Sequence, residues 1–106
     1  MKITINNMTW SVVFVSQNDM PIKHGNEELL SLGYTSYGDL KIYINKDVDE
    51  QVMHKSLIHE LTHAYISSFG FTFVTMTEET MCEFMSYYST SINQLLKAIV
   101  EQLEKE

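Results

Sequence analysis

The sequence predicts an α+β fold in which a small, mostly antiparallel sheet packs against two long helices. Strand-like segments occupy the first half of the chain, and apolar residues recur at helical spacing through most of the second half. Of the 106 residues, 44% are hydrophobic and 20% are charged, which is typical of a globular protein. Because the chain has no repeat, low-complexity tract or linker, we expect residues 1–106 to form a single domain.

Three segments are expected to be strands. Residues 2–5 (KITI) and 10–15 (WSVVFV) are rich in β-branched and aromatic side chains, and Asn6-Asn7 between them predicts a turn. Residues 39–47 (DLKIYINKD) alternate apolar with polar side chains, which indicates a strand with one buried face. The strands therefore precede the helices along the chain.

A long helix is expected next. Asp47 with Glu50 three residues later resembles an N-terminal capping box, and Gly70 is placed to end the helix. The apolar residues between these ends recur at helical spacing, and they are Met53, Leu57, Ile58, Leu61, Ala64, Tyr65 and Phe69. The segment that carries the chemistry discussed below therefore lies on a helix.

A second long helix is predicted to begin after Thr77, whose hydroxyl is a suitable N-cap. Met76 and Met81 stand at the positions of a hydrophobic staple around that cap. This helix is expected to continue to about Leu103. A shorter helical turn is predicted over residues 27–33, with its last glycine as the stop.

Composition excludes several classes of function. The net charge is −7, and the seven basic residues are scattered lysines, so we do not expect nucleic acid as a partner. No apolar run reaches the roughly 18 residues of a membrane span, and the first ten residues lack the apolar segment of a signal peptide. We therefore expect no membrane association. The single cysteine, Cys82, fits a reducing, cytoplasmic setting.

Residues 57–65 (LIHELTHAY) hold the most informative pattern. His59 and His63 are four residues apart, so on a helix both imidazoles project from one face and can bind one Zn²⁺. Glu60 lies about 100° further round the helix, where it can take a proton from a metal-bound water without occupying a coordination position. The alternative is an ordinary structural helix that carries two histidines.

A catalytic zinc usually has three protein ligands, and the second helix offers Glu78, Glu79 and Glu83. Glu79 begins a stripe of short side chains that includes Cys82 and Ser86, and such a stripe would let two helices approach closely. We therefore expect Glu79 as the third ligand, ahead of Glu78 and then Glu83, which could instead accept a hydrogen bond from a ligand histidine. The alternative is that all three are solvated acids at a helix N-terminus.

Residues 57–65 followed by residues 78–86 (EETMCEFMS) resemble the ImmA/IrrE-like metallopeptidases, and more closely the short phage and mobile-element proteins related to them. The resemblance covers about residues 33–90. It implies a minimal zincin-like fold, a zinc held by the two histidines and Glu79, and cleavage of a repressor or other regulatory protein. This chain departs from many members at Thr62, where they have glycine, and it lacks the extra domains of larger members.

The predicted function is therefore a zinc-dependent metallopeptidase that cuts a specific protein or peptide substrate, with Glu60 as the general base. One alternative is a non-catalytic zincin-like protein of phage or mobile-element origin that acts on a host or regulatory protein by binding, and another is a purely structural zinc domain. Residues 39–45 (DLKIYIN) are read either as an edge strand that pairs with substrate or as a structural strand. Three tyrosines could supply a phenol to the site or simply pack: Tyr65, Tyr87 and Tyr88. The oligomeric state is left open.

Overall fold

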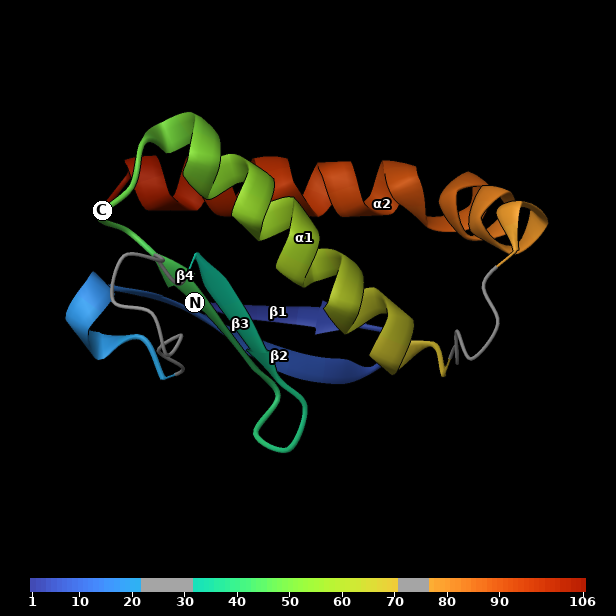
Figure 1. The fold of residues 1–106 in the computed structure, drawn as a ribbon, viewed down its shortest axis with the longest axis horizontal. Coiled ribbons are helices and arrows are strands. Elements are labelled where there is room, and N and C mark those ends of the chain that lie inside the picture. Colours follow the sequence, from blue (N-terminus) through green and yellow to red (C-terminus); the bar gives the residue numbers. More distant parts are fainter. Residues whose placement is uncertain (22–31, 71–76) are drawn as a thin grey trace.

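The computed structural model describes residues 1–21, 32–70 and 77–106. The elements, in chain order, are β1 (Lys2–Ile5), β2 (Met8–Val15), the 3-10 turn η1 (Gln17–Asp19), β3 (Gly33–Ser36), β4 (Lys41–Asn45), α1 (Glu50–Ser68) and α2 (Glu78–Glu104). The strands form one sheet, and both helices lie over the same side of it (Figure 1). This arrangement confirms the predicted α+β class.

The sheet has the strand order β1-β2-β4-β3. The outer pairs, β1 with β2 and β3 with β4, are antiparallel, whereas the central pair β2 and β4 is parallel. Side chains alternate between the two faces of each strand. The register sets Ile3 opposite Trp10 and Val12 opposite Ile42, and all four are buried. One face of the sheet is therefore apolar, and α1 packs across it.

The first hairpin is tight. Asn6 and Asn7 both have positive φ, +47° and +66°, and together they join β1 directly to β2. A two-residue connection with both central residues in this region matches the twist of a right-handed hairpin, and asparagine tolerates it better than most residues do. The predicted turn is confirmed.

The edges of the sheet differ from expectation. Residues 39–45 were expected to form either an edge strand or a purely structural strand, and the edge reading is wrong because β4 has β2 on one side and β3 on the other. The outer strand beside it is β3, which the sequence did not predict and which folds back onto β4 through residues 37–40. The helical turn predicted over residues 27–33 lies largely outside the described residues, and Gly33 begins β3.

The ends of the helices follow local rules, with one correction. The N-cap of α1 is Asp49, whose carboxylate accepts from the Gln51 N–H at 2.9 Å; the predicted capping box from Asp47 is wrong. Asp47 instead accepts from the Gln17 N–H at 2.9 Å. Gly70, with φ of +74°, follows the last turn of α1 as predicted.

Thr77 is confirmed as the N-cap of α2, because its hydroxyl accepts from the Thr80 N–H at 3.1 Å. Its predicted partner in a hydrophobic staple, Met76, lies outside the described residues. The helix continues to Glu104, one residue past the predicted end. No helix in the described part of the chain is long and apolar enough to cross a bilayer.

The core lies between the sheet and the two helices. Phe84, Ile92 and Ile99 are the buried residues of α2, and they join the sheet residues and the inner face of α1 in one cluster. Cys82 and Ser86 are exposed, so the stripe of short side chains is not the surface by which α2 contacts α1. That expectation was wrong because the larger apolar side chains of α2 bury more surface when they face the core.

Candidate metal centre

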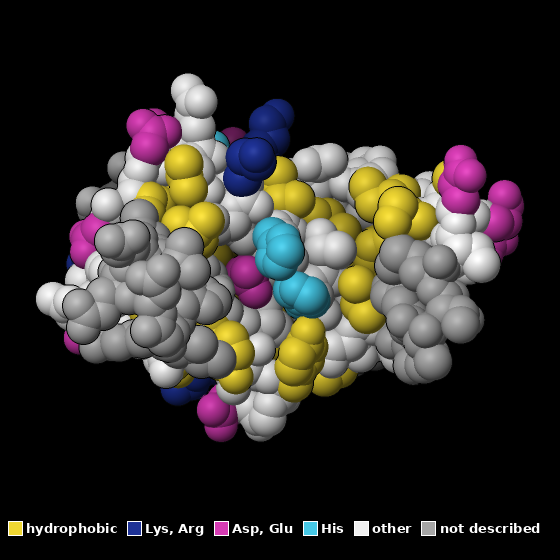
Figure 2. All heavy atoms as spheres, in the orientation of Figure 1, with side chains coloured by type: hydrophobic (Ala, Val, Ile, Leu, Met, Phe, Trp, Pro, Cys, Tyr) yellow, Lys and Arg dark blue, Asp and Glu magenta, His cyan; other side chains and the backbone are white. Residues whose placement is uncertain are grey.

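His59 and His63 stand next to each other on the outer face of α1, where Figure 2 shows them side by side. Their Nε2 atoms are 3.2 Å apart. Two nitrogens bound at the usual 2.0–2.1 Å to one tetrahedral Zn²⁺ would be separated by about 3.3–3.4 Å. The pair therefore fits a zinc ion as two of its ligands, as the i and i+4 spacing on a helix predicts.

Glu60 follows His59 on the same turn of α1 and is buried, with a relative exposure of 7%. Residues i and i+1 of a helix are separated by about 100°, so His59 faces solvent while Glu60 faces β3. One carboxylate oxygen, Oε1, accepts from the Thr35 hydroxyl at 2.8 Å. The other, Oε2, lies 4.0 Å from His59 Nε2. The carboxylate is thus held at its inner oxygen, and its second oxygen lies near the histidine pair.

Gly33, two residues before Thr35 in β3, lies beside the Glu60 side chain. A β-carbon added at Gly33 would lie 2.9 Å from both Cγ and Oε2 of Glu60. Contacts that short require some atom to move. The glycine therefore leaves the space that the carboxylate occupies. Neither Gly33 nor Thr35 was among the predicted site residues, because their role depends on the pairing of a strand that the sequence did not reveal.

Tyr37 is a further residue near the site. It stands two positions after Thr35, and its ring lies edge-on to the ring of the buried Trp10, with centroids 6.5 Å apart. Burial raises the pKa of Tyr37, and the charge of Glu60 raises it further. The phenol therefore stays protonated to a higher pH than a free tyrosine does.

The three tyrosines considered as phenol donors from the sequence lie elsewhere. Tyr65 is buried against Phe69 and Tyr88 in the aromatic contact between the two helices, and burial raises its pKa. Tyr87 is 71% exposed on the outside of α2. Tyr65 and Tyr88 lie in the aromatic packing between α1 and α2, which accounts for their positions.

Glu78, Glu79 and Glu83 are all exposed in the first turns of α2. Within residues 1–21, 32–70 and 77–106, no group of three or more His, Cys, Asp and Glu side chains is placed to hold a metal ion. The structure thus brings together two of the three predicted ligands, His59 and His63, and does not bring Glu79 to them. Glu79 as the third ligand stays a prediction.

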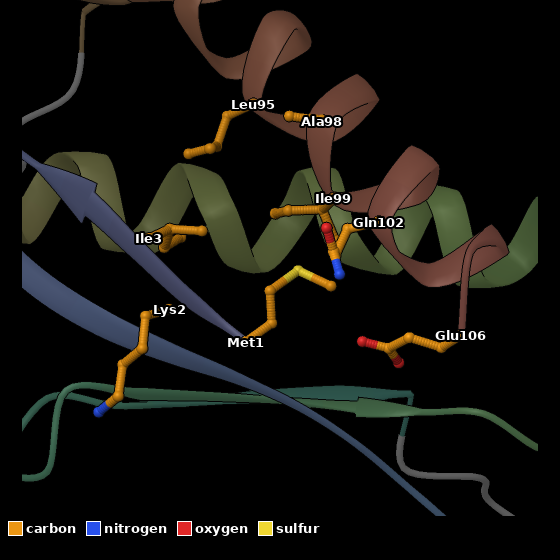
Figure 3. Close-up of a pocket in the computed structure, with 8 residues that line it drawn as sticks. All are labelled: Met1, Lys2, Ile3, Leu95, Ala98, Ile99, Gln102 and Glu106. Carbon is orange, nitrogen blue, oxygen red and sulfur yellow. The ribbon is translucent and has the colours of Figure 1, made fainter.

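A hollow lies away from these residues, between the start of β1 and the C-terminal turns of α2 (Figure 3). Its volume is about 460 Å³, and its lining includes Ile3, Leu95 and Ile99. None of the predicted site residues borders it. The exposed histidine pair, and not this groove, is therefore the candidate site.

Comparison of the chain with models of known families, with curated proteins and with solved structures finds no match.

Proposed function

We propose that the protein is a zinc-dependent peptidase that hydrolyses a peptide bond in a specific protein substrate. The observation that carries the proposal is the arrangement on one turn of α1. Two imidazole nitrogens lie 3.2 Å apart, and a carboxylate oxygen of Glu60 lies 4.0 Å from one of them. These distances support a metal held by the two imidazoles beside a carboxylate that acts as the base.

In this proposal His59 and His63 hold the metal through Nε2, with Glu79 as the first-ranked third ligand on the strength of the resemblance. Zn²⁺ bound there would supply Lewis acidity and lower the pKa of a water. Glu60 would serve as the general base, with Oε2 as the proton acceptor and later the proton donor to the leaving amine. The fixed position of Glu60 Oε1 against Thr35 supports this role, since a base must be oriented to be efficient.

The proposed substrate is an extended segment of a protein, such as a repressor or other regulator. A chain of 106 residues has little surface with which to build several specificity pockets, which favours one dedicated substrate over broad degradation. The outer strand β3 flanks α1 and is where such a segment could add main-chain hydrogen bonds. The single cysteine supports action in a reducing cytoplasm.

The second candidate is a zincin-like protein that acts by binding a host or regulatory protein without cutting it. Large apolar side chains exposed on both helices favour this candidate, and they are Val52, Ile58, Met81, Met85 and Tyr87. Hydrophobic side chains also gather on both sides of the histidines in Figure 2. Exposed apolar surface of this kind is typical of contact with another protein.

The decisive experiment measures metal and cleavage together. Purified protein is assayed for zinc by elemental analysis and then incubated with a peptide library, with new termini identified by mass spectrometry. We expect about one zinc per chain and a restricted set of cut sites. Glu60→Gln should retain the zinc and lose cleavage by a factor on the order of 1,000 or more, because the base is gone. A protein without stoichiometric zinc would contradict the proposal, and cleavage that survives Glu60→Gln would contradict the role of Glu60.

The third ligand is tested by replacing each glutamate separately with glutamine, at positions 78, 79 and 83. We expect Glu79→Gln to weaken zinc binding by on the order of 100-fold, because an amide oxygen is a poorer zinc ligand than a carboxylate. The other two variants serve as matched controls of equal charge change. Equal affinity in all three variants would show that the ligand is elsewhere.

A further inference from the structure

We infer that β3 positions Glu60, the proposed general base. Thr35 is the positioning residue that bonds to the carboxylate of Glu60, and Gly33 leaves room for that carboxylate. This inference rests on the proposed function, in which Glu60 is the general base. It assigns a role to a strand that carries none of the residues in the HExxH pattern.

The Thr35 hydroxyl has one proton to donate, and its closest acceptor is Glu60 Oε1 at 2.8 Å. The backbone oxygen of Glu60 is a second and longer contact, at 3.4 Å. Thr35 is itself buried, with a relative exposure of 5%, so water competes little for this bond. A hydrogen bond to a carboxylate in such surroundings is stronger than one between neutral groups at a surface.

This bond distinguishes the two carboxylate oxygens. Thr35 holds Oε1, while Oε2 lies beside Gly33 and 4.0 Å from His59 Nε2. A carboxylate without the Thr35 bond could rotate about its last torsion, which is broad for glutamate. Proton transfer needs the acceptor oxygen within hydrogen-bond reach, so such rotation would lower the fraction of competent sites.

Gly33 contributes by having no side chain. Because a β-carbon at this position would lie 2.9 Å from Oε2, any larger residue must displace the flexible Glu60 side chain. Strand alternation places Gly33 and Thr35, two residues apart, on the same face of β3. One face of one strand therefore supplies both the clearance and the hydrogen bond that set the position of Glu60.

The test compares Thr35→Val, Thr35→Ser and Gly33→Ala. Thr4→Val, at an exposed position of β1, is the control for a threonine-to-valine change in a strand. Gly38→Ala is the control for an added methyl group, since a β-carbon at Gly38 would meet no atom of the described residues within 4 Å. Each variant is measured for zinc affinity, for thermal stability, and for kcat and KM on a library peptide that the wild type cleaves.

We expect Thr35→Val and Gly33→Ala to lower kcat by on the order of 10- to 100-fold, with KM and zinc affinity close to wild type. Thr35→Ser retains the hydroxyl and should recover most of the loss, while both controls behave as wild type. Unchanged kcat in Thr35→Val or Gly33→Ala would overturn the inference. So would a serine variant as impaired as the valine variant, because that result would indicate a packing role for the methyl group.

A double-mutant cycle tests the contact without any activity. Thr35→Val and Glu60→Ala are made singly and together, and unfolding is followed in urea. The hydrogen bond predicts non-additivity of about tenfold in the unfolding equilibrium constant. Additive effects would overturn the inference. A coupled pair in a wild-type protein that holds no zinc would overturn the proposed function and the positioning role with it, while leaving the contact itself demonstrated.

Discussion

At the scale of single residues, one turn of α1 separates the two kinds of group that the proposed chemistry needs. The side chain of His59 is 67% exposed, whereas that of Glu60 is only 9% exposed. The difference follows from helix geometry, since neighbouring residues point in directions about 100° apart. The His59 imidazole is thus open to solvent, while the Glu60 carboxylate is buried and bonded to Thr35 of β3. The sequence alone predicted the angle between the His59 and Glu60 side chains but not the burial of Glu60 against β3.

The histidine pair gives a direct prediction at this scale. His59→Ala and His63→Ala should each weaken zinc binding by on the order of 100-fold or more, because each removes one of a small number of ligands. His54→Ala is the control, since His54 lies five residues earlier and has Glu50 as its neighbour, with Nε2 and Oε1 3.8 Å apart. Competition against a chelator of known affinity measures the effect. An equal loss in the His54 variant would contradict the assignment.

At the scale of elements, local signals set where the helices begin and end. Thr77 and Gly70 act where the sequence predicted, because capping depends on a few neighbouring residues. The start of α1 was displaced from Asp47 to Asp49, since both are acceptable caps and Asp47 is instead bonded to Gln17 across the fold. The hydrogen bond between Gln17 and Asp47, which are 30 positions apart, thus decided which of the two aspartates caps α1.

The end of α1 gives the second prediction. Gly70→Ala should lower the free energy of unfolding by about 1 kcal/mol, because Gly70 has a φ of +74° that a β-carbon disfavours. Gly38→Ala is the control and should change stability little, as its position is open. Urea unfolding of both variants measures the difference. Equal stability of the two variants would show that the strain at Gly70 is relieved by fraying of the helix end.

At the scale of the whole molecule, Trp10 joins the sheet to α1. It is fully buried in β2, and its Nε1 donates to the Ser68 hydroxyl at 2.9 Å. Asn6, in the first hairpin, also donates from its side chain to the Ser68 backbone oxygen at 2.9 Å. Two side chains of the first hairpin, about 60 positions before Ser68, therefore hold the C-terminal end of α1 against the sheet.

The hydrogen bond between Trp10 and Ser68 gives a prediction about stability. Trp10→Phe should lower the free energy of unfolding by about 2–4 kcal/mol, since it removes the donor to a buried hydroxyl and leaves a cavity. Tyr87→Phe, at a position that is 71% exposed, is the aromatic control and should change stability by less than about 0.5 kcal/mol. Denaturant unfolding followed by circular dichroism measures both. A small effect of Trp10→Phe would mean that the end of α1 is held by other contacts.

The sequence by itself determined the α+β class, the first hairpin, the caps at Thr77 and Gly70, and the pairing of His59 with His63. Each of these depends on periodicity or on residues within a turn of one another, where side-chain type and backbone geometry act directly. Only the tertiary structure decided that β3 and not β4 is an outer strand, that the apolar side chains of α2 and not its short ones face the core, and that Thr35 donates a hydrogen bond to Glu60. The last two join residues about 25 positions apart or more, whereas β3 pairs with β4 across the short connection of residues 37–40. The arrangement that buries the most apolar surface decides these features. That burial depends on the whole fold, so no local sequence pattern encodes it.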